Sequence, residues 1–275
     1  MVSPAALKFD DILYEKKAGI ARITINRPQS YNSVTQHSIE ELTAAFRDAA
    51  EDDEVGVIVF TGAGEKAFCS GGNMQSISER TSSVKRGHLR VMANLAVTMR
   101  TSGKPIIAAV NGYAIGLGNE LHVICDLSIA ADHAKFGQTG PKMGSVPVWG
   151  ATTLLHRTVG EKKAREMLYL CRQYTAQQAL EMGLVNAVVP MSELAATVDA
   201  WCQEILDKSP QTLRIAKLAF NQESDQSLWG GMFAGAEMLA MHIDSEEHVE
   251  GPKAWLDKRK PDFRRYRAKK IKTSL

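Results

Sequence analysis

The sequence predicts an α/β protein built in layers, and two patterns carry that prediction. Short apolar runs rich in β-branched residues, at 56–62, 105–112 and 127–132, are typical of buried strands. Amphipathic segments with helical spacing separate these runs, and strands that alternate with helices favour parallel pairing through right-handed crossovers. Beyond residue 150 the patterns are almost entirely helical, so a helical region should follow the layered part.

The elements of the first half can be justified in order. Residues 11–25 alternate polar and apolar around a turn at 17–19, which predicts a hairpin of two strands. From Thr35 onward, apolar residues recur at helical spacing with acidic residues on the other face, which predicts a helix. A second helix is expected over 88–100, and a glycine-rich turn that opens a third helix over 112–126.

The second half predicts one brief strand at 185–190 among helices. The segments expected to be helical are 151–171, 175–184, 191–209, 210–222 and 233–250. The stretch 258–272 is rich in Lys and Arg, and its simplest interpretation is a chain end exposed to solvent.

Composition narrows the classes of protein. The 275 residues are 44% hydrophobic and 23% charged, which is ordinary for a globular chain with a sizeable core. Thirty-three Lys and Arg face 31 Asp and Glu without a separate basic domain, so binding to nucleic acid is excluded as the main function. Apolar runs long enough for a membrane span or a signal peptide are missing, and the four dispersed cysteines disfavour a zinc site or a disulfide framework. We therefore expect a cytoplasmic protein without a metal and without a membrane partner.

Two segments, 55–74 and 105–126, share one construction, in which a buried strand leads into a small-residue turn and then towards a helix. Glycine lets the backbone approach a ligand closely, and a helix N-terminus presents free N–H groups. If both turns face one point, they make an oxyanion hole; otherwise they are ordinary turns between strands and helices. The second turn lacks the spacing of a dinucleotide fingerprint.

Four sequence motifs resemble those of the crotonase superfamily, whose founding activity is enoyl-CoA hydration. They lie at 26–34, 66–74, 108–132 and 181–190. The resemblance runs from about Phe9 to Tyr266. It implies a ClpP-like crotonase fold of repeated ββα turns, with a spiral core over 1–200 and a helical C-terminal trimerisation region over 201–275. It also implies a homotrimer, or a homohexamer formed as a dimer of trimers.

The same resemblance implies a substrate and a site. The substrate would be an acyl-CoA thioester, with coenzyme A as part of the substrate and no permanently bound cofactor. The backbone N–H groups of Gly72 and Leu117 would stabilise its thioester oxygen. The implied contacts to CoA are Gln29, Ser30, Tyr31, Ala67, Ser70, Asn73 and Met74, with Lys258, Lys260 or Phe263 at its nucleotide end. Asn73 fits a helix N-cap equally well.

Glu120 stands where the hydratases hold the first of two catalytic glutamates. A carboxylate in the first turn of a helix, beside apolar residues, suits general acid/base catalysis because burial can raise its pKa towards neutrality. Gly140 occupies the place of the second glutamate. Hydration by two glutamates is therefore not supported, although one glutamate can still hydrate a double bond or shuttle a proton during its isomerisation.

A second reading comes from 134–145, 160–190 and 257–266, which look most like 1,4-dihydroxy-2-naphthoyl-CoA synthase and 2-ketocyclohexanecarboxyl-CoA hydrolase. These relatives form or open carbocyclic rings, and some synthases hold a bicarbonate in place of the missing carboxylate. The matching residues here are Gln138, Thr139, Gly140 and Ser145. The departures are Pro147 in place of an aspartate, Ile243 near the place of a catalytic tyrosine, and Glu120 in place of an aliphatic residue.

Two further residues allow two interpretations each. His242 is either a replacement base or a structural histidine, and Trp149 either walls the acyl pocket or belongs to the core. Three hypotheses for the function therefore stay open. The first is an enzyme of the enoyl-CoA hydratase/isomerase type with Glu120 as acid/base. The others are a ring-cleaving or ring-forming acyl-CoA enzyme, and a CoA-thioester binder whose chemistry has decayed.

Overall fold

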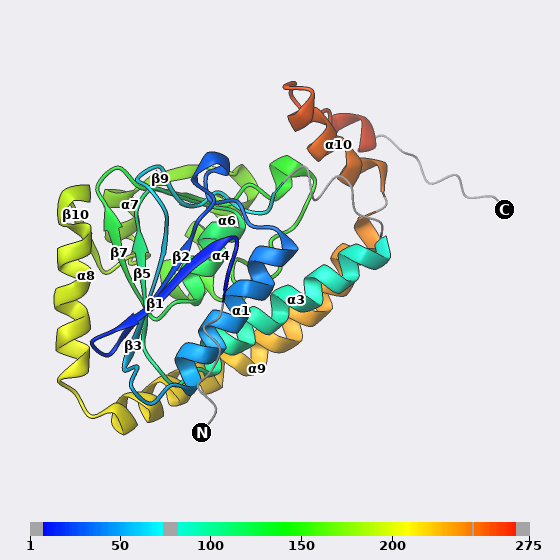
Figure 1. Cartoon of the computed structure of the whole chain (residues 1–275). Coiled ribbons are helices and arrows are strands. Elements are labelled where there is room, and N and C mark those ends of the chain that lie inside the picture. The colour runs from blue at the N-terminus through cyan, green and yellow to red at the C-terminus, as the bar shows by residue number, and fades with distance from the viewer. Residues whose placement is uncertain (1–7, 74–81, 244, 268–275) are drawn as a thin grey trace.

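A computed structural model describes residues 8–73, 82–243 and 245–267 of the chain (Figure 1). Its larger sheet has the strand order β1-β2-β3-β5-β7-β10, in which β1 and β2 form the expected antiparallel hairpin and the other neighbours are parallel. These strands are β1 (Ile12–Lys17), β2 (Ile20–Ile25), β3 (Val57–Gly62), β5 (Ile106–Val110), β7 (Leu127–Ala131) and β10 (Ala187–Val189). The α/β prediction is confirmed.

The second sheet is small and has the order β4-β6-β8-β9, with β9 antiparallel to β8. Its strands are β4 (Ala67–Cys69), β6 (Tyr113–Ile115), β8 (Lys135–Gly137) and β9 (Gln173–Thr175). The sequence analysis missed them, because three residues are too few to reveal a period of two. They complete the ββα units: β3 and β5 join the large sheet, β4 and β6 join the small one, and a helix follows each pair.

The helices connect and cover the two sheets. They are α1 (Gln36–Glu51), α3 (Ser82–Thr101), α4 (Leu117–Ile124), α5 (Leu155–Val159), α6 (Glu161–Leu170), α7 (Ala176–Glu181), α8 (Met191–Leu206), α9 (Pro210–His242) and α10 (Glu246–Leu256). Short 3-10 turns add η1 (Pro28–Ser30), η2 (Pro141–Met143) and η3 (Arg264–Tyr266). Thr35 begins α1 by a reciprocal capping pair with Ser38. No helix in the described ranges combines the length and apolarity that a membrane crossing requires.

Helix α9 differs from the prediction, because it runs unbroken through 223–232, where two helices with a gap were expected. Two glycines in that stretch each cost a helix about 1 kcal/mol relative to alanine. Burial of Leu228 and Met232 in the main core offsets this cost, and buried polar contacts fix the part of α9 that precedes the glycines. The Lys217 ammonium binds the Asp126 carboxylate at 2.7 Å, and Arg100 of α3 donates to Asn221 at 2.8 Å and to Ser224 at 2.7 Å.

Both faces of the large sheet are buried along its central strands β3, β5 and β7, which explains their continuous apolar runs. Val57 and Val59 of β3 pack in one cluster with α8, whereas Ile58 and Phe60 pack in the other with α1 and α3. Figure 1 shows α8 along one side of the sheet and α1, α3 and α9 on the other. Helix α10 lies beyond the ends of α3 and α9 and contacts η2.

Candidate functional site

The two glycine turns of the sequence lie against each other. A Cβ atom on Gly71 would lie 3.8 Å from the backbone nitrogen of Leu117, and one on Gly118 would lie only 1.9 Å from the carbonyl oxygen of Cys69. Gly71 also has a φ of 112° and Gly116 a φ of 58°, which favour glycine. Direct backbone contact between the turns therefore requires glycine at 71 and 118.

The predicted oxyanion donors flank this contact. Leu117 is the first residue of α4, and the first N–H groups of a helix have no partner within the helix. Gly72 lies in a short parallel bridge with Val34, whose N–H donates to the Gly71 carbonyl at 3.0 Å. The Asn73 N–H donates back to the Val34 carbonyl at 2.9 Å, so the chain after η1 supports the first turn.

The structure brings most of the predicted CoA contacts together. Ser70 donates from its backbone to the Tyr31 carbonyl at 3.1 Å and from its hydroxyl to the Ser30 carbonyl at 3.4 Å. Gln29 is exposed in η1, beside Ser30. Ala67 is buried, and its carbonyl accepts from the Asn32 side chain at 2.7 Å. Met74 lies outside the described residues.

Tyr31 extends this group into a recess at the surface. Tyr31 is 48% exposed, and its ring meets the ring of Tyr113 edge to face, with centroids 6.4 Å apart. The recess measures about 580 Å³ and its lining includes both tyrosines, Lys66 and Lys135. Aromatic rings beside ammonium groups suit a flat heterocycle that carries phosphates.

Glu120 is 4% exposed, and three consecutive backbone groups hold one of its carboxylate oxygens. Oε1 accepts from the N–H groups of Trp149 at 2.8 Å, Gly150 at 2.9 Å and Ala151 at 3.2 Å. Burial raises the pKa of this carboxyl to about 7, although the three N–H groups lower it in part. A carboxyl with this pKa is suited to proton exchange near neutral pH.

Sequence reasoning missed these three N–H groups, which we call the N–H nest (149–151). Any residue other than proline carries a backbone N–H, so nothing in the side chains signals it. Trp149 itself is buried among the residues of the main core, as the core interpretation expected.

Gly140 adjoins the second turn through Thr139, whose hydroxyl would lie 3.4 Å from a Cβ on Gly116. A Cβ on Gly140 itself would approach Pro147 Cδ to 2.7 Å and the Ser145 carbonyl to 2.9 Å. A side chain at 140 therefore has no room. Gln138 is fully buried, and neither atom of its amide finds a hydrogen-bond partner within the described residues.

The candidate residues near the C-terminus do not lie together: some contact η2 or Gly144, and the others are exposed after α10. Phe263 packs on η2, with a ring carbon 3.3 Å from where a Cβ on Gly144 would lie. Lys258 and Lys260 are exposed after α10. His242 has both ring nitrogens engaged, Nε2 with the Gly144 carbonyl at 3.1 Å and Nδ1 with the Ser245 hydroxyl at 3.1 Å, which fits its structural interpretation.

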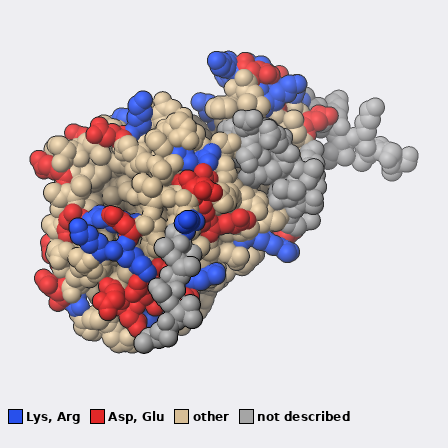
Figure 2. Space-filling view, in the orientation of Figure 1, with Lys and Arg blue, Asp and Glu red and all other residues tan. Residues whose placement is uncertain are grey.

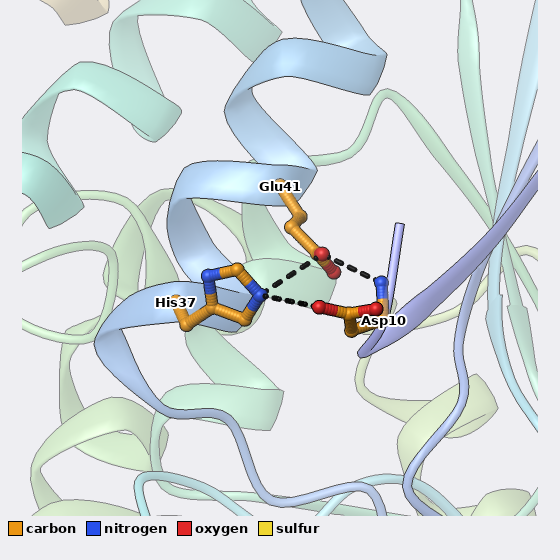
Figure 3. Close-up of side chains that lie close together, drawn as sticks. All are labelled: Asp10, His37 and Glu41. Carbon is orange, nitrogen blue, oxygen red and sulfur yellow. Dashed lines mark hydrogen bonds and ion pairs between the residues drawn. The ribbon is translucent and has the colours of Figure 1, made fainter. Parts of the chain in front are cut away.

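A separate cluster lies at the start of α1, where His37 approaches two carboxylates (Figure 3). Its Nε2 is 3.1 Å from Glu41 Oε1 and 3.6 Å from Asp10 Oδ2. Glu41 is already satisfied, because its two oxygens accept from the backbone N–H groups of Asp10 and Asp11 at 2.7 and 2.8 Å. The cluster therefore anchors the chain before β1. Elsewhere, acidic and basic side chains are interspersed on the face seen in Figure 2.

Comparison with known proteins identifies the family of the chain. A family model described as enoyl-CoA hydratase/isomerase matches residues 15–266. An enoyl-CoA hydratase from Mycobacterium avium subsp. paratuberculosis K-10 is 31% identical over 93% of this chain and 99% of its own, with a TM-score of 0.82. An enoyl-CoA hydratase/isomerase from Xanthobacter autotrophicus Py2 is 30% identical over 91% and 94%, with a TM-score of 0.83. The chain belongs to the enoyl-CoA hydratase/isomerase family, within the crotonase superfamily.

Proposed function

We propose that this enzyme uses Glu120 as its single acid/base on an enoyl-CoA thioester, either adding water to the double bond or moving it. The observation that carries the proposal is the buried Glu120 carboxyl, whose pKa of about 7 fits proton exchange at neutral pH. Its position in the first turn of α4 also supports the proposal, because it follows by two residues Gly118, which contacts the first glycine turn.

The proposed chemistry divides between the turns and the carboxyl. Removing a proton next to the thioester carbonyl, or adding a nucleophile to its conjugated double bond, places negative charge on the thioester oxygen. The N–H groups of Gly72 and Leu117 would receive that oxygen, and such preset donors stabilise the charge by several kcal/mol. In isomerisation, Glu120 takes the proton from one carbon and returns it to another, so a single carboxylate suffices.

The crowding at Gly140 supports one carboxylate rather than two. Because a Cβ there would collide with Pro147 and with the Ser145 carbonyl, a second glutamate cannot be accommodated without moving this loop. A binder without chemistry would gain nothing from a buried carboxyl at this pKa, because its burial costs stability.

A turnover screen tests the proposal. The purified protein is incubated with crotonyl-CoA, a 3-enoyl-CoA, a cyclohexenecarboxyl-CoA and 2-ketocyclohexanecarboxyl-CoA, and the products are separated chromatographically. Hydration or isomerisation of an enoyl-CoA supports the proposal. Conversion of the ketocyclohexane thioester alone would replace it. Calorimetry with acetyl-CoA at millimolar concentration tests binding separately, and the absence of both heat and thermal stabilisation would remove its basis.

The ring-forming or ring-cleaving alternative has one observation in its favour, the buried Gln138 amide without a partner among the described residues. This amide lies next to Thr139 and Gly140 in the chain, and its N–H groups can donate hydrogen bonds to the oxygens of a bicarbonate ion. Under this alternative, adding bicarbonate or substituting Ser145→Ala should change the turnover rate. The Glu120→Gln variant should keep most of the wild-type turnover. The screen above would show ring chemistry.

We also propose a homotrimer or homohexamer, because α9 and α10 expose large apolar side chains that a second copy would cover. Phe220 is 83% exposed, and the others are Ile215, Leu218, Phe233, Met238, Met241, Val249, Trp255 and Leu256. Exposed apolar surface of this extent is typical of an interface. Sedimentation velocity at micromolar concentration is the check, and a single monomer near 30.1 kDa contradicts this proposal.

A further inference from the structure

The C-terminal helices contact the segment that follows β8 at several points, and two histidines meet at one of them, the backbone carbonyl of Gly144. His242, at the end of α9, approaches this oxygen with Nε2 at 3.1 Å, and His248 of α10 approaches it with Nδ1 at 2.9 Å. A carbonyl oxygen can only accept, so each of these nitrogens must carry a hydrogen. The two imidazoles then use both lone pairs of the Gly144 carbonyl, an arrangement we call the imidazole clamp.

Ser245 links the two histidines of the clamp. Its hydroxyl oxygen accepts from the backbone N–H of His248 at 3.1 Å. The hydroxyl hydrogen can then point to Nδ1 of His242 at 3.1 Å, which must be an acceptor if Nε2 carries the hydrogen of a neutral ring. The two rings stand edge to face, with centroids 5.6 Å apart.

The backbones on either side of the clamp touch. A Cβ on Gly251 of α10 would lie 1.9 Å from the Met143 carbonyl, and one on Gly144 would lie 2.7 Å from the Glu247 carbonyl. Gly144 also has a φ of 67°, which favours glycine. The contact therefore leaves η2 no freedom to slide along α10.

The clamped segment leads directly to the N–H nest that holds Glu120. The Ser145 N–H donates to the Gly140 carbonyl at 2.9 Å, which closes the loop after β8. Pro147 restricts the next residues, and its ring lies where a side chain at Gly140 would be. Trp149, the first donor of the nest, follows two residues later.

We propose that His242 and His248 are positioning residues: by clamping the Gly144 carbonyl, they hold the loop that carries the N–H nest (149–151) against the Glu120 carboxylate. The inference rests on the proposed function of Glu120. The three N–H groups lower the pKa of this carboxyl against its burial, so a nest that shifts would let the pKa rise above about 7. The acid limb of the rate profile would move to higher pH with it.

The test exchanges the two imidazoles for amides that do or do not place a donor at the same point. An asparagine amide nitrogen corresponds to Nδ1 of histidine, and a glutamine amide nitrogen corresponds to Nε2. The matched double variant is therefore His242→Gln with His248→Asn. The mismatched one is His242→Asn with His248→Gln, which has the same composition. His37→Leu, on α1, is the control for removing an imidazole elsewhere.

Two readouts are measured on each variant, which is first checked for folding by circular dichroism. The first is the Glu120 carboxyl titration by carbon-13 NMR without substrate. The second is kcat and KM for the best enoyl-CoA against pH. The mismatched variant should raise the pKa of Glu120 by about one unit and thereby lower kcat at pH 7 about fivefold, with KM within about threefold. The matched variant and His37→Leu should stay close to wild type.

An unchanged Glu120 titration in a folded mismatched variant overturns the clamp. Failure of the proposed function looks different, because Glu120→Gln would then leave turnover intact while the NMR titration still responds to the mismatch. If the mismatched pair does not fold, the single variants His248→Asn and His248→Gln repeat the comparison at one ring. Equal titration of Glu120 in those two also overturns the clamp.

Discussion

Glu120, at the start of α4, and Glu250, in α10, are both only 4% exposed, yet their pKa values move in opposite directions. Glu250 accepts two hydrogen bonds from Arg259, at 2.6 and 3.0 Å, and one from the Asp262 N–H at 2.8 Å. These bonds, with Arg265 nearby, lower its pKa to about 2. Glu120 receives only backbone N–H groups, and burial raises its pKa to about 7.

The difference shows what compensates a buried carboxylate. A guanidinium brings a full opposite charge with its hydrogen bonds, whereas three N–H groups bring only dipoles. Glu250 consequently keeps its charge and joins α10 to the chain after it. Glu120 is left able to exchange its proton near neutral pH, which a structural anchor would not need.

The largest effect is expected for Glu120, the residue of this comparison to which we assign a chemical function. Glu120→Gln keeps the shape of the side chain but removes the proton carrier, so turnover should fall by at least roughly a hundredfold. Dissociation constants for acyl-CoA should change little, because the lost interaction belongs to the transition state. Steady-state kinetics and calorimetry measure the two quantities. The control is Glu193→Gln on α8, and turnover within threefold of wild type for Glu120→Gln would favour the ring-chemistry alternative.

The second prediction concerns stability against pH. The pKa of Glu120 is raised from 4.5 to about 7 on folding, so the folded chain keeps a proton that the unfolded chain has released. The free energy of unfolding should therefore fall by ~3 kcal/mol as pH rises through this window. Glu120→Gln should be more stable than wild type at pH 8 and lose that advantage at pH 4.5. Urea unfolding measures it, and an equal difference at both pH values would contradict the prediction.

The third prediction concerns the place of the absent second acid. Gly140→Ala pushes a methyl group against Pro147 and the Ser145 carbonyl, so it should lower the free energy of unfolding by about 1–3 kcal/mol. Gly230→Ala is the matched control, since a Cβ on Gly230 in α9 meets nothing within 4 Å. Alanine there should be neutral or stabilising by up to about 1 kcal/mol. Equal effects of the two substitutions in urea unfolding would mean that the loop at 145–147 yields easily.

The smallest effect is expected for Glu250, the residue of this comparison to which we assign a structural function. Glu250→Gln removes the charge that Arg259 and Arg265 surround, so the melting temperature at pH 7 should fall by a few degrees. Because the pKa of Glu250 is lowered on folding, its contribution is present above pH 4.5 and is lost as pH falls towards 2. Glu247→Gln, an exposed neighbour on α10, is the control. Scanning calorimetry at pH 7 decides, and equal melting temperatures would contradict the anchoring function of Glu250.

The sequence predicted much of the fold because strong local patterns specify it. The hairpin before 26, the helix after Thr35 and the buried strands of the large sheet each repeat a period over enough residues to be recognised. The three-residue strands of the small sheet and the continuous middle of α9 were missed. Pairing with distant strands creates the first, and burial of Leu228 and Met232 in the core supports the second.

By itself, the sequence determined which residue types are present: glycines at both turns, a glutamate in the first turn of α4 and no acid at 140. Only the tertiary structure decided that Gly71 and Gly118 let the two turns touch, that Pro147 occupies the space beside Gly140, and that backbone groups rather than cations hold Glu120. Proton affinity depends on solvent access and on the nearest dipoles and charges. Segments far apart in the chain supply both, so no pattern within one segment could reveal them.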